Sequence, residues 1–311
     1  MGNPSFVHAC GVAALSWFAA AAASAAPVSI PFDFSKGAIA VEITAGGAPL
    51  RVLVDTGVDP SVIDLGRVEA LGLKLDRAAA GAGSGIGGTK RATAMPTTLA
   101  GLAVGGRAAA PFAALATDLG DLSTAYGARL DGILGYSYLN GRIVLIDYPA
   151  GRLTLFDHRA EAIAATAPCR RRWLIPMRML KGENWPLIPL RLGSATALAT
   201  LDTGHDGTLN LYRRALDLPG VRAALSQAGE TRASGFNGDE RRSQWRMTAP
   251  IGVGPFDLAP GALVTLADTE GSADTSLANA GNRLFAALRL RLLLDYRDRQ
   301  IGLYGDCGSP A

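Results

Sequence analysis

The sequence predicts an all-β chain built as two similar halves, and two observations support that prediction. The first is composition: of 311 residues, 49% are hydrophobic, only 18% are charged and 38 are glycine. Many glycines with few long charged runs favour short strands joined by tight turns over a bundle of helices. The second is a tandem repeat, which divides the chain into two units of the same layout.

The repeat is visible in two separate blocks. Leu53-Val54-Asp55-Thr56-Gly57-Val58-Asp59 recurs as Thr200-Leu201-Asp202-Thr203-Gly204-His205-Asp206. Near the end of each half, Val144-Leu145-Ile146-Asp147-Tyr148 recurs as Leu292-Leu293-Leu294-Asp295-Tyr296. Because both blocks repeat at nearly the same offset, we interpret the chain as a tandem duplication. Residues 1–25 form a leader, 26–160 the first lobe and 161–311 the second lobe.

Each half has the same predicted order of elements. An apolar strand enters the Asp-Thr-Gly turn, a short helical piece follows, and a Gly-rich turn and further strands lead to a closing hairpin. The helical pieces are predicted at Leu65–Leu71 and Leu211–Leu216. Gly132-Ile133-Leu134-Gly135 precedes the first closing hairpin, and Asn279-Ala280-Gly281-Asn282 is its weak counterpart. A strand order of this kind predicts two lobes of matching topology.

The paired Asp-Thr-Gly turns point to acid–base chemistry. Two carboxylates near one water cannot both stay ionised, so they hold one proton between them. The ionised member takes a proton from water, and the protonated member polarises a substrate carbonyl. Gly57 and Gly204 allow tight turns next to the aspartates, and Thr56 and Thr203 are expected to hydrogen-bond across the lobe interface. We therefore predict Asp55 and Asp202 as the catalytic pair.

With these motifs, the chain resembles the aspartic peptidases, and the retropepsin-like bacterial group more than the pepsin branch. Leu53–Asp59 is similar to the retroviral active-site loop, and Gly85-Ile86-Gly87-Gly88 is similar to the tip of the retroviral flap. Gly132–Gly135 is similar to the apolar-apolar-Gly element that supports the active-site loop. Gly281-Asn282-Arg283 resembles the Gly-Arg-Asn stretch of the viral enzymes with its last two residues transposed.

The resemblance implies the acid-protease fold, two homologous β-barrel-like lobes with the active site in the cleft between them. It also implies substrate contacts from Asp59 and Asp206 and from flap residues Gly85, Ile86 and Gly87. Alternatively, Asp59 and Asp206 cap their own turns or pair with an arginine such as Arg283. A second flap at Gly235–Gly238 is left open.

The sequence departs from the pepsin branch directly after each Asp-Thr-Gly. Val58 and His205 stand where that branch has Ser or Thr, so a hydroxyl that would hydrogen-bond the ionised pair is missing. Activity nearer neutral pH is the expected consequence. His205 either couples its titration to the pair or points outward.

The first 25 residues are expected to direct export. Small and apolar residues run from Gly11 to Ala26, and Ala23-Ser24-Ala25 has the form that signal peptidase accepts. Residues 1–10 contain no Lys or Arg, so a retained membrane anchor is the alternative to a cleaved signal. We expect a periplasmic or secreted protein. In that setting Cys169 and Cys307 are expected to form a disulfide, with two free thiols as the alternative.

The predicted function is an aspartic endopeptidase that hydrolyses extended polypeptides. The alternative is an exported module on the same scaffold that binds peptides without cutting them. A formal net charge of only +3 argues against nucleic acid as the main partner. Beyond the leader only His158 and His205 remain among the histidines, so we expect no metal and no cofactor. The two lobes of one chain are expected to act as a monomer.

Overall fold

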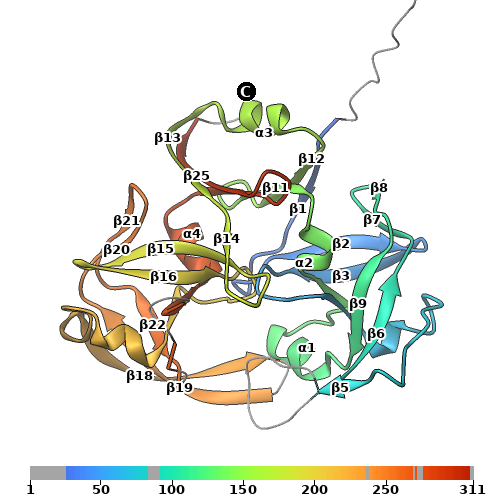
Figure 1. Cartoon of the computed structure of the whole chain (residues 1–311), viewed down its shortest axis with the longest axis horizontal. Helices are drawn as coiled ribbons and strands as arrows, with labels where there is room; N and C mark the ends of the chain where they lie inside the picture. Colours follow the sequence, from blue (N-terminus) through green and yellow to red (C-terminus); the bar gives the residue numbers. More distant parts are fainter. Residues whose placement is uncertain (1–25, 83–91, 236–237, 269, 272–275, 309–311) are drawn as a thin grey trace, which may run out of the picture.

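The computed structural model describes residues 26–82, 92–235, 238–268, 270–271 and 276–308. They form three sheets, with one lobe on each side of a shared sheet (Figure 1). The predicted all-β, two-lobed architecture is therefore confirmed. Within this part of the chain, no helix is both long and apolar enough to cross a membrane.

The first lobe is a nine-stranded sheet. Its strands, in spatial order, are β5 (Gly81–Ala82), β6 (Thr93–Leu99), β9 (Phe112–Thr117), β4 (Ser61–Asp64), β10 (Gly132–Leu134), β3 (Ala48–Val54), β2 (Ala40–Ala45), β7 (Leu102–Val104) and β8 (Arg107–Ala108).

The second lobe repeats that order strand for strand. Its strands are β18 (Leu225–Gly235), β19 (Gly238–Met247), β22 (Leu263–Leu266), β17 (Leu209–Leu211), β23 (Ala278–Ala280), β16 (Ala195–Leu201), β15 (Pro186–Leu192), β20 (Ile251–Val253) and β21 (Phe256–Leu258), with β14 (Arg178–Met179) added beside β15. The matching order extends the duplication seen in the sequence to the whole topology of both lobes.

The shared sheet joins the halves. Its order is β1 (Val28–Pro31), β12 (Arg152–Phe156), β11 (Ile143–Asp147), β24 (Arg291–Asp295), β25 (Gln300–Cys307) and β13 (Cys169–Pro176). The equivalent strands β11 and β24 are antiparallel neighbours at its centre, with Leu145 opposite Leu293. An approximate two-fold axis therefore passes between these two strands.

Local sequence explains the strands that lead to the site. In β2 and β3, Ala45 pairs with Ala48, and the two-residue loop of Gly46 and Gly47 has φ of +56° and +84°. Such a loop requires the left-handed region at both positions, which glycine adopts at low cost. The end of β3 is apolar and buried throughout, as expected for a strand covered on both faces.

Helices are few and short among the described residues. They are α1 (Gly120–Tyr126), α2 (Tyr136–Leu139), α3 (Arg159–Thr166), α4 (Asn282–Ala287) and the 3-10 turns η1 (Leu65–Arg67), η2 (Arg213–Asp217) and η3 (Arg222–Ala224). The helical piece predicted at Leu211–Leu216 begins too early, because Leu211 is still in β17 and pairs with Leu266. The segment that joins the halves contains α3, which packs on β11, β12 and β24.

A disulfide joins Cys169 of β13 to Cys307 of β25, the outermost pair of the shared sheet. Those residues are 138 apart in sequence, so the bond closes a loop that contains nearly all of the second lobe. A crosslink over a long loop restricts the unfolded chain more than the folded one.

We expect the double variant Cys169→Ala/Cys307→Ala to lose about 2–5 kcal/mol of unfolding free energy. Urea unfolding followed by tryptophan fluorescence measures the loss. Reductant should lower the midpoint of the wild type and leave that of the double variant unchanged. Equal midpoints for the two oxidised proteins would show that the crosslink contributes nothing.

Candidate active site

Asp55 and Asp202 occupy equivalent places in the two lobes. Each directly follows the strand that leads to the lobe interface, β3 or β16. The Asp55 amide donates to the carbonyl of Leu134 in β10, and the Asp202 amide donates to the carbonyl of Ala280 in β23, both at 3.0 Å. Only 8% of Asp55 and 9% of Asp202 is exposed. The fold thus holds both carboxyl groups rigidly at a nearly buried place.

The two carboxyl groups converge over the glycines of the turns. They lie within hydrogen-bonding reach of each other. A Cβ added to Gly57 would lie 2.9 Å from Asp202 Oδ1 and 3.2 Å from Asp55 Oδ1. A Cβ on Gly204 would lie only 2.0 Å from Asp55 Oδ2. Glycine at these positions is therefore required by the close approach of the opposite carboxylate.

The threonines lock the turns together. Thr56 Oγ1 donates to the Leu201 carbonyl at 2.6 Å and accepts the Thr203 amide at 3.0 Å. In the reverse direction, Thr203 Oγ1 donates to the Val54 carbonyl at 2.9 Å and accepts the Thr56 amide at 3.0 Å. Both threonines are fully buried. These four bonds place each threonine as the sequence analysis expected, across the lobe interface.

The environment keeps the pair from carrying two charges. Burial raises the pKa of Asp55 well above its usual range, and the charge of the neighbouring Asp202 raises it further. The Gly57 amide, which donates to Asp55 Oδ1 at 2.7 Å, opposes this shift. A site with one ionised and one protonated carboxyl can act as base and acid at once.

Comparisons with known proteins concern the family and the fold. Residues 41–138 match the model of a family described as aspartyl protease. The fold is similar to the crystal structure of an aspartic proteinase from Irpex lacteus, with a TM-score of 0.52 and 13% identity over 91% of this chain and 98% of that one. A search of curated proteins finds no match.

The family match lies within the first lobe and the fold match covers both lobes, so together they support an aspartic peptidase assignment. The matched family region contains the first Asp-Thr-Gly turn, and the structural likeness extends the two-lobed fold over both turns. The narrower resemblance to the retropepsin-like bacterial group stays a prediction.

The residues predicted to contact substrate lie in different environments. Asp59 Oδ2 accepts the side-chain amide of Asn184, a residue of the second lobe, at 2.8 Å. The side chain of Asp206 is exposed, and its backbone carbonyl accepts Arg283 Nε at 2.7 Å. The arginine thus contacts the main chain of Asp206. The predicted flap residues Gly85, Ile86 and Gly87 lie outside the described residues.

His205 is packed inward, so the outward orientation considered from the sequence is wrong. A Cβ on Gly281 would lie 2.5 Å from His205 Nδ1, and a Cβ on Gly207 would lie 2.7 Å from Nε2. Burial lowers the pKa of the imidazole, which favours its neutral form beside the pair. Its backbone amide donates to Asp202 Oδ1 at 3.2 Å.

Two buried or half-buried asparagines belong to the site and were missed from the sequence. Asn279 Nδ2 donates to Asp202 Oδ2 at 3.1 Å. Asn282 Nδ2 donates to the Thr203 carbonyl at 2.6 Å, while its Oδ1 accepts the hydroxyl of Tyr148 from the other half. The sequence signals for them are the weak counterpart of Gly132–Gly135 and, for Asn282, the Gly281-Asn282-Arg283 stretch.

The predicted counterpart of Gly132–Gly135, residues 279–282, begins one residue too late. Ile133 pairs with Leu53, two residues before Asp55, and Asn279 pairs with Thr200, two residues before Asp202. The segment equivalent to Gly132–Gly135 is therefore 278–281. Gly135 and Gly281 then correspond, and each contacts the active-site loop so closely that a Cβ would overlap its backbone.

A long hairpin of the second lobe reaches the first lobe. Strands β18 and β19 pair from Leu225 and Met247 out to Gly235 and Gly238, and β18 contacts α1 (Figure 1). Gly235 and Gly238 pair at the end of this hairpin, and residues 236–237 between them, part of the stretch considered above as a second flap, lie outside the described residues. The hairpin thus connects the two lobes opposite the shared sheet.

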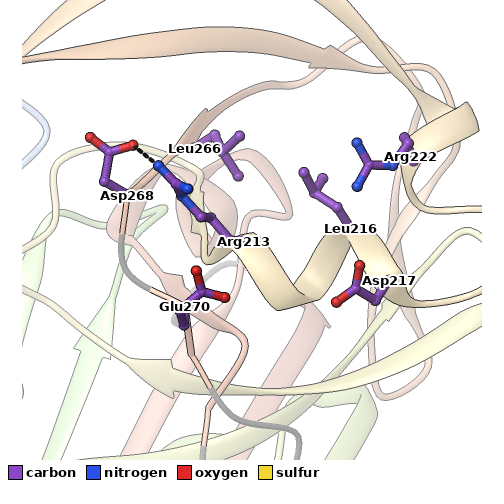
Figure 2. A pocket seen from close by; sticks show the side chains of 7 residues that line it. All are labelled: Arg213, Leu216, Asp217, Arg222, Leu266, Asp268 and Glu270. Carbon is purple, nitrogen blue, oxygen red and sulfur yellow. Dashed lines mark hydrogen bonds and ion pairs between the residues drawn. The ribbon is translucent and has the colours of Figure 1, made fainter.

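A separate hollow of about 350 Å³ lies on the second lobe (Figure 2). Its wall is mostly charged and includes the ion pair of Arg213 and Asp268 at 2.8 Å. The full lining is Arg213, Leu216, Asp217, Arg222, Leu266, Asp268 and Glu270. It contains no residue of either Asp-Thr-Gly turn, so it is a different feature from the candidate site.

We expect Thr56→Val to destabilise the protein by about 2–4 kcal/mol, because the Leu201 carbonyl and the Thr203 amide lose a buried partner. Thermal and urea unfolding measure the change. Thr44→Val, an exposed substitution on β2, is the matched control and should change stability little. Equal losses for both variants would contradict the role of the buried bonds.

We expect Asp55→Asn to raise stability at neutral pH. The raised pKa means that folding favours the protonated carboxyl, so the wild type is stabilised below the unfolded pKa and loses that contribution as pH rises. An amide carries no such penalty. The stability difference between variant and wild type, measured by urea unfolding, should therefore shrink towards low pH. A difference that grows on acidification would contradict the raised pKa.

Proposed function

We propose that this protein is an aspartic endopeptidase that cleaves extended polypeptides by means of a water activated between Asp55 and Asp202. The observation that carries the proposal is the meeting of two nearly buried carboxyl groups from equivalent turns, with the pKa of Asp55 raised. Family and fold support a protease-like protein. The carboxyl pair supplies the chemistry that such a protein needs.

The reaction uses one shared proton. The ionised carboxylate removes a proton from water as the oxygen attacks the peptide carbonyl, and the protonated carboxyl donates to the carbonyl oxygen. The carboxyl that took the proton from water then donates it to the departing amine as the carbon–nitrogen bond breaks, and the other carboxylate takes back a proton from a hydroxyl of the tetrahedral intermediate. Acid and base exchange roles within one turnover, so neither needs a cofactor to be restored.

The substrate is proposed to be an extended chain that lies across the pair, beneath the hairpin of β18 and β19. That hairpin spans from the second lobe to α1 of the first lobe, which supports its role as a cover. Strand β18 is at the edge of its sheet, and an edge strand can pair with an extended peptide through its outer backbone groups. We propose that the protein acts as a monomer, since both halves of the site come from one chain.

Export to the periplasm or beyond also remains a proposal. The disulfide of Cys169 and Cys307 supports it, because such bonds persist in oxidising compartments and are rare in the cytosol. Association with a membrane is proposed only if the N-terminal segment is retained.

Cleavage of a heat-denatured protein mixture, followed by mass spectrometry at pH values from about 4 to 8, tests the function. We expect Asp55→Asn and Asp202→Asn each to lower kcat/KM by at least about 10²–10⁴-fold, because each removes an acid–base partner. Pepstatin should inhibit the wild type. Asp268→Asn, on an almost fully exposed carboxyl, is the matched control and should cleave normally.

Absence of cleavage at every pH would refute the proposed peptidase activity. If both asparagine variants then bound peptide as well as the wild type, the protein would instead be a peptide-binding module on this scaffold.

A further inference from the structure

Asn279 gives Asp202 a hydrogen-bond donor that the fold positions from a neighbouring strand. Strand β23 lies parallel to β16, with Asn279 beside Thr200, two residues before Asp202. From there its Nδ2 reaches Asp202 Oδ2 at 3.1 Å. The other carboxylate oxygen, Oδ1, accepts the backbone amides of Gly204 at 3.0 Å and His205 at 3.2 Å. Both oxygens of Asp202 thus accept hydrogen bonds, which favours its ionised form.

Two hydroxyl groups hold the amide of Asn279 in the donating orientation. The hydroxyl of Tyr212 donates to Asn279 Oδ1 at 3.0 Å, and the hydroxyl of Thr200 donates to the same oxygen. An amide turned the other way would bring its oxygen against the Asp202 carboxylate, with no hydrogen between two acceptors. The network therefore presents the NH₂ group to Asp202.

The first lobe has no matching amide at this position. Ile133 occupies the equivalent register position beside Leu53, and its alkyl side chain has no hydrogen to donate. The main chain of the two lobes corresponds closely here. The Asp55 amide donates to the carbonyl of Leu134, which follows Ile133, and the Asp202 amide donates to the carbonyl of Ala280, which follows Asn279, both at 3.0 Å. The side-chain donor of Asn279 therefore distinguishes Asp202 from Asp55, in addition to the backbone amide of His205.

We propose that Asn279 is a positioning residue, oriented by Tyr212 and Thr200, that keeps Asp202 ionised and leaves the shared proton of the pair on Asp55. The inference rests on the proposed function and deepens it. Asp202 then acts as the base towards water, and Asp55 donates to the substrate carbonyl in the first step. Asn279 also takes over, for one aspartate, the hydrogen bond lost where His205 replaces a hydroxyl residue.

The remaining groups around the pair do not supply this asymmetry by their own titration. Burial lowers the pKa of His205 and raises that of Tyr212, so burial favours the neutral form of both side chains. Burial likewise raises the pKa of Tyr296, which lies near Asp55. The charged groups that face His205 and Tyr212 from adjacent elements are Asp206 and Arg242.

The decisive variant is Asn279→Leu, which keeps the volume and removes the donor. Since the donated bond stabilises the ionised pair, its loss should raise the apparent pKa of the acid limb of kcat/KM by about one pH unit. Tyr212→Phe, which leaves the amide less firmly oriented, should shift the limb in the same direction by less. The pH profile of peptide cleavage measures both.

Asn210→Leu is the matched control. Asn210 lies on β17 directly opposite Asn279, is equally a polar residue of the sheet interior, and accepts the hydroxyl of Thr265 at 2.8 Å. Its replacement should lower stability and leave the acid limb in place. The proposal would be overturned if the apparent pKa of the acid limb shifted equally in Asn279→Leu and Asn210→Leu. It would also be overturned if that pKa were unchanged in both Asn279→Leu and Tyr212→Phe.

A readout independent of turnover separates this inference from the proposed function. Carbon-13 NMR titration of the aspartate carboxyl groups, assigned with Asp55→Asn and Asp202→Asn, should show Asp202 ionising first in the wild type. In Asn279→Leu that step should move to higher pH. First ionisation at Asp55 overturns the inference even if the protein is a peptidase, whereas absent cleavage with the expected titration refutes only the enzyme. Should Asn279→Leu fail to fold, Tyr212→Phe carries the same titration test.

Discussion

The structure depends on the reciprocal hydrogen bonds of Thr56 and Thr203. Each threonine hydroxyl donates to a main-chain carbonyl of the opposite lobe, each threonine amide donates to the hydroxyl of the other threonine, and both residues are buried. A small relative rotation of the lobes would break several of these bonds at once and leave buried groups without partners, which is costly. The closeness of Asp55 and Asp202 is thus set by bonds one residue away, and Gly57 and Gly204 only make room for it.

The shared sheet gives that interface a second, distant support. Strands β11 and β24 run antiparallel at its centre, and the ion pair of Asp147 with Arg291 at 2.7 Å joins them at one end. Because equivalent strands meet on the approximate two-fold axis, the shared sheet places the two lobes in equivalent positions. The hydrogen-bond donors around the two carboxyl groups differ all the same, and the difference comes from individual residues next to them, chiefly Asn279 and His205.

Sequence reasoning found what is encoded in contiguous residues. An Asp-Thr-Gly turn after an apolar strand is a local motif, so its two copies predicted the turns, and the repeat predicted the fold. Asn279 could not be found in this way, since its contact with Asp202 depends on the register between β16 and β23. That register is set by backbone pairing of distant segments, and the small residues Ala280 and Gly281 gave too little pattern to align it. Leu211 was misassigned for a related reason: an apolar run suits a short helix and a buried strand alike.

If the shared proton rests mainly on Asp55, the preference for that arrangement has an upper limit. The two carboxyl groups must exchange their roles within one turnover, so a base stabilised too strongly as an anion would accept the proton of water poorly. A cation beside Asp202 would impose such a bias, because the attraction of two full charges would add to the hydrogen bond. The side-chain amide of Asn279 is a neutral donor, held by neutral hydroxyl groups. It can favour one resting arrangement of the proton and still permit the exchange that peptide hydrolysis requires.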